Sequence, residues 1–266
     1  MSNMKKPYEK LLDEQERLYQ DAVTKQQQGE TNVRFGRPWV SASRIAEQYY
    51  CEQKVELHQQ LGEIETEEKQ RGTDAHEELT EEAIETSRAE LFERIYSDQL
   101  TVAQEMLVMS RFRDLVLLGQ VDAVVFRHGQ ALMLFEFKFS RSKIPYNGYH
   151  VQAKVYGKIL EGMGLDVSNL HYVIAVIPPA SRNESTLFST IVDAALTNGP
   201  NQARLNVGPA HVYVYPYRSH DAERDIDWAL DYWRSNREAI PTRNPNKCKS
   251  CEYRNSCKVK AEVSAR

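Results

Sequence analysis

The stretch GQVDAVVFRHGQALMLFEFKFS, residues 119–140, decides the fold. Two apolar runs rich in Val, Leu and Phe flank His128-Gly129-Gln130, so the pattern predicts two strands joined by a hairpin turn. Asp122 interrupts the first run, and Glu136 and Lys138 interrupt the second. A charge inside an apolar strand is costly unless it is paired or used. These three residues are therefore the first candidates for a functional site.

The length of the hairpin loop decides whether the three charges meet. Glu136 and Lys138 are two residues apart, so both side chains point to one face of their strand. With a three-residue loop at 128–130, Asp122 faces Glu136 and all three groups converge, whereas a two-residue loop places Asp122 on the opposite face. We therefore predict an odd-numbered loop or a β-bulge in this hairpin.

Two carboxylates on one face of a sheet bind a hard divalent cation such as Mg²⁺ or Mn²⁺. Such a cation lowers the pKa of a bound water and stabilises charge on a phosphate oxygen. A nearby lysine holds the attacking water and offsets negative charge in the transition state. These are the requirements of phosphodiester hydrolysis. The alternative interpretation is a structural salt bridge among Asp122, Glu136 and Lys138, and these residues alone leave both interpretations open.

The four cysteines also form a pattern. Cys248-x2-Cys251-x5-Cys257 lies near the end of the chain, and Cys51 lies far upstream. Four thiolates bind either Zn²⁺ or a [4Fe–4S] cluster, and the spacing does not choose between them. Such a site would tie the N-terminal helical region to the C-terminal segment. The alternative, unrelated reduced cysteines, fits Cys51 better than the other three.

Composition excludes several classes of protein. The chain has 266 residues, 41% hydrophobic and 27% charged, which excludes a disordered chain, a collagen and a disulfide-rich miniprotein. A net charge of −4 excludes a globally basic nucleic-acid coat protein, but not an enzyme with a local basic groove. No run approaches the roughly 18–20 apolar residues of a membrane span, and no apolar core of a secretory signal follows the first lysines. We expect a cytoplasmic protein with reduced thiols.

The order of periodic segments predicts a mixed α/β core. Polar residues 1–36 carry a weak helical stripe, and residues 181–209 fit no element. We expect further helices from Ser41 (an N-cap) to about Leu61, from Thr73 to about Ile95, over 149–162 and over Asp221–Ile240. We expect strands at Glu105–Met109, Leu115–Phe126, Ala131–Phe139, His171–Ile177 and His211–Tyr215.

Six short segments occur in one order between about Val40 and Cys257: VSASRIAEQYYCEQKVEL, RGTDAHEEL, GQVDAVV, EFK, QAKVY and CKSCEYRNSC. Together they resemble the RecB-like branch of the PD-(D/E)XK nucleases with a four-cysteine iron–sulfur cluster. Within that branch the chain is most similar to the CRISPR-associated exonuclease family, the fourth of the numbered Cas proteins. Each motif alone is weak evidence, but six in the same order are strong.

The resemblance implies a PD-(D/E)XK (restriction-endonuclease-like) core with a mixed central sheet, flanking helices and a cluster-binding segment that joins the N- and C-terminal regions. It implies that His76, Asp122, Glu136 and the carbonyl of Phe137 bind Mn²⁺ or Mg²⁺, and that Lys138 activates the water. It implies that Gln152 and Tyr156, four apart on one helix face, act as catalytic residues that support the site or the scissile phosphate. It also implies that Cys51, Cys248, Cys251 and Cys257 hold a [4Fe–4S] cluster.

The implied activity is metal-dependent exonuclease action on DNA, mainly single-stranded, in CRISPR spacer acquisition alongside integrase proteins or in DNA repair and recombination. We expect no membrane partner, and oligomers are compatible with the family. The chain divides into a peripheral helical extension (1–36), a helical region with the first cluster cysteine and His76 (37–100), the nuclease core (101–218) and a C-terminal helix with the cluster-binding segment (219–266). Two alternatives stay open: a non-catalytic iron–sulfur adaptor that binds DNA ends, and a four-cysteine zinc scaffold.

Five further residues have two interpretations each. Glu105 either reaches the metal or is a surface carboxylate. Arg44 and Lys54 flank Cys51 and either contact DNA phosphates or are solvated. Tyr49 and Tyr50 either stack on bases or pack against the helix.

Overall fold

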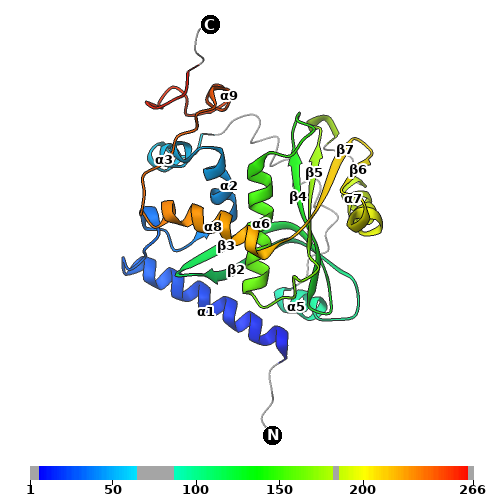
Figure 1. The fold of residues 1–266 in the computed structure, drawn as a ribbon. Coiled ribbons are helices and arrows are strands. Elements are labelled where there is room, and N and C mark those ends of the chain that lie inside the picture. Colours follow the sequence, from blue (N-terminus) through cyan, green and yellow to red (C-terminus); the bar gives the residue numbers. More distant parts are fainter. Residues whose placement is uncertain (1–5, 65–86, 182–185, 263–266) are drawn as a thin grey trace.

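A mixed seven-stranded sheet forms the centre of the molecule, which the computed structural model describes over residues 6–64, 87–181 and 186–262 (Figure 1). The strand order is β1-β3-β4-β5-β7-β6, with β2 paired to β3 outside this path. The strands β2, β3 and β4 form an antiparallel meander, and β5 runs parallel to β4 after a helical crossover. Their bounds are Val40–Ser41 (β1), Thr101–Phe112 (β2), Leu115–Arg127 (β3), Gln130–Phe139 (β4), His171–Ile177 (β5), Arg204–Val207 (β6) and Ala210–Pro216 (β7).

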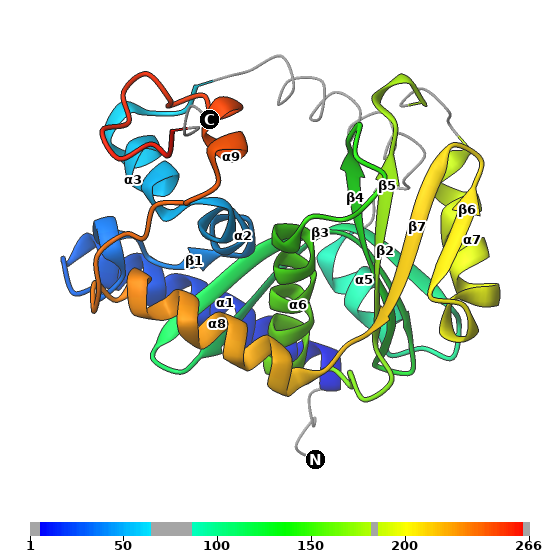
Figure 2. The same ribbon diagram turned by 45° about the horizontal axis from the view of Figure 1, so that its top comes forward.

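Helices cover both faces of this sheet (Figure 2). The described helices are Pro7–Gln27 (α1), Ala42–Tyr50 (α2), Glu52–Leu61 (α3), Arg88–Ile95 (α5), Asn147–Gly162 (α6), Leu187–Asn198 (α7), Ser219–Trp233 (α8) and Pro245–Lys249 (α9), with 3-10 turns at Arg34–Gly36, Pro179–Ser181 and Gly199–Asn201. One apolar cluster joins α2, α6 and α8 to the sheet, and a second joins α7 to the opposite face. Burial on both faces explains why the central strands read as nearly continuous apolar runs.

The hairpin between β3 and β4 has a two-residue turn, so the three-residue loop expected from the sequence is wrong. Arg127 pairs with Gln130 across His128-Gly129, whose φ angles are 54° and 74°, the left-handed conformations of a tight hairpin turn. The register then shifts between Val125 and Phe126, which confirms the predicted bulge.

The bulge places Asp122 on the same face of the sheet as Glu136, whereas the two-residue turn without a bulge would place them on opposite faces. Phe126 pairs with Ala131, but Val125 pairs with Met133, so one additional residue lies on β4. The last pair, Ala123 with Phe135, leaves Asp122 and Glu136 next in line on a common face. Leu134 belongs to the apolar cluster on the α6 side, and alternation directs Glu136 and Lys138 to that same side.

Three other expectations need correction. The helix expected from Ser41 to Leu61 is two helices, because Cys51 is extended with φ −172° and ψ 118°. Ser41 does cap α2, since its hydroxyl accepts the amide hydrogen of Arg44 at 3.3 Å. The last long helix ends at Trp233 rather than Ile240, and the unassigned region 181–209 contains α7 and β6. Of the helix expected from Thr73, only α5 lies within the described residues.

The N-terminal extension is a helix, as its weak stripe predicted, and it packs on the meander. Leu11 in α1 is 4% exposed, and the side-chain amide of Gln15 donates to the carbonyl of Met109 in β2 at 2.6 Å. No helix in the described part of the chain is long and apolar enough to cross a membrane.

A Gly119→Ala variant tests the packing of α6 on β3. A Cβ atom at Gly119 would lie 2.4 Å from Cε1 of Tyr156, so the ring must move. We expect a loss of about 1–3 kcal/mol in the free energy of unfolding, the usual cost of overpacking a core, measured by urea denaturation. At Gly199 the nearest atoms are side-chain methyl groups of Met133 and Val214, at 3.2 Å, so Gly199→Ala should lose less stability than Gly119→Ala. Equal stability of both variants would contradict this packing.

Candidate active site and cysteine pocket

The Glu136 carboxylate is the most buried charge of the site. Its residue is 0% exposed, and the ammonium of Lys138 forms an ion pair with it. Burial by itself lowers the pKa of Lys138, but the charges of Glu136 and Asp122 outweigh burial and raise that pKa above its ordinary value. Lys138 is therefore a cation at neutral pH, held between two carboxylates.

Asp122 is fixed across the hairpin. Its Oδ2 accepts the backbone N–H of Phe137 at 2.6 Å, so the carboxylate lies at the backbone between Glu136 and Lys138. The Phe137 ring points away into the α7-side core, where it lies 5.3 Å from the ring of Phe188. The backbone of Phe137 thus faces the site while its side chain anchors the strand.

A chain of hydrogen bonds on α6 orients the lysine. Lys138 Nζ donates to Gln152 Oε1 at 3.3 Å, and Gln152 Nε2 donates to the Tyr156 hydroxyl at 3.0 Å. That hydroxyl donates to the carbonyl of Gln120 at 2.7 Å. Burial, reinforced by the charges of Glu136 and Asp122, raises the pKa of Tyr156 well above its ordinary value, so Tyr156 remains a neutral donor. Lys138 also lies 5.3 Å from the ring centre of Tyr149.

The structure brings together those residues, selected by the sequence for this site, that lie within its described part. His76 lies outside the described residues. Among the described residues, no three His, Cys, Asp or Glu side chains are arranged to hold one metal ion. Five selected side chains meet on one side of β4, those of Asp122, Glu136, Lys138, Gln152 and Tyr156, and the backbone of Phe137 lies beside them.

Glu105 is a neighbour that the sequence left undecided. It lies on β2 between the pairs Gln104–Ala123 and Met106–Val121, and hence beside Asp122. Its φ of 50° is unusual for a residue in a strand, and its charge contributes to the raised pKa of Tyr156. Only the antiparallel register of β2 on β3 places Glu105 beside Asp122, and a sequence prediction that included this register would have chosen Glu105 as a site residue.

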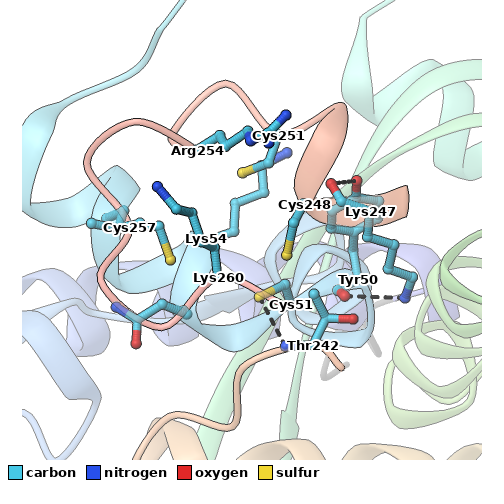
Figure 3. A pocket seen from close by; sticks show the side chains of 12 residues that line it. Tyr50, Cys51, Lys54, Thr242, Lys247, Cys248, Cys251, Arg254, Cys257 and Lys260 are labelled. Carbon is cyan, nitrogen blue, oxygen red and sulfur yellow. Dashed lines mark hydrogen bonds between the residues drawn. The ribbon is translucent and has the colours of Figure 1, made fainter. Parts of the chain in front are cut away.

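All four cysteines are thiols that line one pocket (Figure 3). Cys51 comes from the break between α2 and α3, and Cys248 from α9. Cys251 and Cys257 follow in the C-terminal loop. Backbone amides point at two of the sulfurs: Thr242 N–H donates to Cys51 Sγ and Ala261 N–H donates to Cys248 Sγ, both at 3.3 Å.

The pocket around the thiols is cationic. Lys54, Lys247, Arg254 and Lys260 line it, and no Asp or Glu occurs among its described lining residues. Glu252 lies outside the lining and forms an ion pair with Lys54 at 3.2 Å. Burial, with the charges of Glu252 and Cys51, outweighs the charge of Lys54 and raises the pKa of the Cys251 thiol, but positive charge in general favours thiolates. The surroundings therefore suit a group that carries negative charge on sulfur.

A buried ion pair connects Cys51 to the C-terminal segment. Glu52, which is 1% exposed, accepts both terminal N–H groups of Arg237 and the backbone N–H of Ile240, each at 2.6 Å. Gln48 Nε2 donates to the same carboxylate at 2.6 Å. The residue next to Cys51 is thus fixed to the chain that leads into α9.

A Glu52→Gln variant tests this connection. It leaves the Arg237 guanidinium without its charged partner, so we expect a loss of about 3 kcal/mol in the free energy of unfolding, the lower end for a broken buried ion pair. The control is Glu93→Gln in the exposed pair with Lys6, which should change stability by less than about 0.5 kcal/mol. Denaturation curves measure both, and similar values for the two variants would contradict a structural role for Glu52.

Comparison with known proteins shows the family of the chain. The sequence profile of the PD-(D/E)XK nuclease superfamily matches residues 10–258. No curated protein matches the chain. Among solved structures, the chain is similar to the crystal structure of SSO0001, with 14% sequence identity, a TM-score of 0.48 and coverage of 93% of this chain and 97% of that one. Because the family profile spans nearly the whole sequence, including both halves of the site, the chain belongs to the PD-(D/E)XK nuclease superfamily.

Proposed function

We propose that the chain is a metal-dependent exonuclease that hydrolyses DNA from single-stranded ends. The observation that carries the proposal is the meeting of Asp122, Glu136 and Lys138 on one side of β4, next to the Gln152–Tyr156 pair of α6. Membership of the nuclease superfamily supports metal-dependent cleavage of nucleic acid. Preference for single-stranded ends rests on the resemblance to the CRISPR-associated exonucleases.

The donor atoms of the site fit a hard divalent cation. Carboxylate and carbonyl oxygens are the ligands that Mg²⁺ and Mn²⁺ prefer, and Asp122, Glu136 and the Phe137 carbonyl would supply them, with His76 as a further proposed ligand. The bound cation would lower the pKa of a water and stabilise charge on the phosphate. Lys138, kept protonated by its two carboxylate neighbours, would orient the attacking water and offset charge that develops on the phosphate oxygens.

Gln152 and Tyr156 would act on Lys138 rather than on the phosphate. Gln152 accepts from the lysine ammonium at 3.3 Å and is itself held by Tyr156 at 3.0 Å. A held ammonium loses less entropy in the transition state than one that must be ordered for each reaction. We therefore assign Gln152 and Tyr156 as positioning residues of the nuclease.

We further propose that Cys51, Cys248, Cys251 and Cys257 hold a [4Fe–4S] cluster. The support is the common pocket of the four thiols, the four cations around it and the two N–H···S hydrogen bonds, because a cluster held by four thiolates is anionic and accepts such bonds. We propose that the protein acts in one of two pathways, CRISPR spacer acquisition with integrase proteins or DNA repair and recombination. The six sequence segments that resemble the nuclease family support both pathways equally.

A Lys138→Ala variant tests the nuclease. End-labelled single-stranded DNA, labelled at either end, is incubated with anaerobically purified protein and Mn²⁺ or Mg²⁺. We expect wild-type protein to shorten the DNA, EDTA to stop the reaction, and Lys138→Ala to be inactive, since removal of one charge stabiliser costs about 10²–10³ in rate. Because the variant leaves the buried Glu136 without its ion-pair partner, we also expect it to be less stable than wild type, and thermal unfolding checks that it is folded under the assay conditions. Lys10→Ala, which removes an exposed lysine from α1, should stay active.

Two results would contradict this proposal. Retained cleavage by Lys138→Ala would remove the lysine from the mechanism. A folded wild-type protein that binds DNA ends without cutting them would favour the alternative, a non-catalytic iron–sulfur adaptor in a larger complex.

The metal content of anaerobically purified protein tests the cluster. We expect a brown protein with iron and acid-labile sulfide in equal amounts, and Cys251→Ser should lower both. Elemental analysis for iron and zinc on the same sample provides the control. A colourless protein with stoichiometric zinc would contradict the cluster and favour the zinc scaffold, since Zn²⁺ also accepts four thiolates.

A further inference from the structure

A groove of about 820 Å³ connects the two sites described above. Its walls come from α2, from the start of α6 and from the segment of residues 244–250 that contains α9. Gln152, the partner of Lys138, lies in its lining. Tyr50, Lys54 and Lys247 line both this groove and the cysteine pocket. One continuous surface therefore leads from the cysteines to Gln152, the hydrogen-bond partner of Lys138.

The groove has an aromatic rim close to that lysine. Tyr146 is 56% exposed, and its ring meets the ring of Tyr149 edge-on at 5.4 Å. Tyr149 in turn lies under Lys138. The neighbouring Ile144 is 68% exposed, and hydrogen bonds of its backbone with the Ser142 hydroxyl fix the loop that presents it. An ordered loop thus holds two large apolar side chains in water, where flat rings of a ligand could cover them.

The groove is also more positive than the chain as a whole. Three cations, Arg44, Lys54 and Lys247, line it against two carboxylates, Glu47 and Glu63, although the net charge of the protein is −4. Arg44 and Lys54 both pair with Glu47, at 2.6 and 3.5 Å, so two cations share one carboxylate and the lining keeps a positive excess. The adjoining cysteine pocket adds two more cations and no acid among its described lining residues. Cations that follow a groove together with stackable aromatic rings are the two features of surfaces that bind single-stranded nucleic acid.

We propose that this groove binds the single-stranded DNA that is fed to Lys138, with a base stacked on Tyr146 and backbone phosphates against Lys54 and Lys247. The proposal rests on the nuclease function proposed above and specifies its substrate path. The cavity falls within the range of about 300–1,000 Å³ of small-ligand pockets, which is room for a few nucleotides of one strand.

The same geometry couples the groove to the cysteines. Lys247 and Cys248 are neighbours on α9, and Lys247 is further held by the carbonyls of Tyr49 and Tyr50 at 3.3 and 3.1 Å. A group bound by the cysteines therefore fixes one wall of the DNA groove, although it lies away from the carboxylates.

The test measures binding without cleavage. All variants are made in the full-length Lys138→Ala protein, with EDTA present, and the probe is a fluorescein-labelled single-stranded DNA 12-mer of mixed sequence followed by anisotropy. The first comparison is Tyr146→Ala, Tyr146→Phe and, as a matched control, Tyr19→Ala, which removes a 41% exposed tyrosine that stacks on Trp39 far from the groove.

The second comparison places a charge in the groove. Ser43 lines it in the first turn of α2, where a carboxylate favours the helix, so Ser43→Glu should fold normally while it repels phosphate. Ser43→Gln is its uncharged match. Thermal unfolding of each variant confirms that it is folded.

We expect Tyr146→Ala to raise the Kd for the single strand by about five-fold or more, as loss of a base–aromatic stack does, and Tyr146→Phe and Tyr19→Ala to bind like the parent. Ser43→Glu should bind more weakly than Ser43→Gln, with a difference that shrinks at high salt. Equal Kd values for Tyr146→Ala and Tyr19→Ala, equal Kd values for the two Ser43 variants, or tighter binding of a duplex or RNA 12-mer, would overturn the proposal.

Failure of the groove and failure of the nuclease remain distinguishable. Cleavage by wild-type protein with no effect of Tyr146 or Ser43 variants on binding would overturn the groove alone. Groove-dependent binding by a wild-type protein that does not cut would support the groove and overturn the nuclease.

Discussion

The burial of a carboxylate on the central strand is the constraint on which the rest of the site depends. Glu136 is 0% exposed, in a sheet that is apolar on both faces, and an isolated charge there would be neutralised or would destabilise the fold. Lys138, two residues along the same face, meets this requirement and remains 25% exposed at its side chain. The pair therefore has one member buried in the core and one member partly accessible to solvent.

The bulge on β4 brings the second carboxylate to this pair. Without its additional residue, the two-residue turn would direct Asp122 toward the α7-side cluster that contains Phe135 and Phe137. A carboxylate there would have no cation and would disrupt aromatic packing. We predicted correctly from the sequence that Asp122 and Glu136 share a face, because buried charges must be paired or used. The sequence could not choose between an odd-numbered loop and a bulge as the means. Loop length and bulge compensate each other, and apolar alternation looks alike in both cases.

The elements missed by sequence reasoning have physical causes. The break at Cys51 was missed because the helical pattern continues across it; Val55 and Leu57 are buried like Ile45 on the preceding helix, and only the tertiary position of the thiol requires an extended residue. Glu105 depends on the register of β2 against β3, which local pattern does not contain. By contrast, β5 was predicted to the residue, because a run buried on both faces between turn signals has few alternatives.

At the junction of α2 and α3, two neighbouring residues, Cys51 and Glu52, direct their side chains to different places. Cys51 faces the cationic pocket, while Glu52 points into the core, where Arg237 and the Ile240 amide satisfy it. Both contacts reach the segment that leads to α9, so the position of Lys247 and Cys248 follows from this one bend in the chain. The groove has α2 as one wall and α9 as the other. The buried Glu52–Arg237 pair therefore supports both walls from within, and the proposed cluster would support the α9 wall from the side of the thiols, so a change at either place would move a wall of the groove.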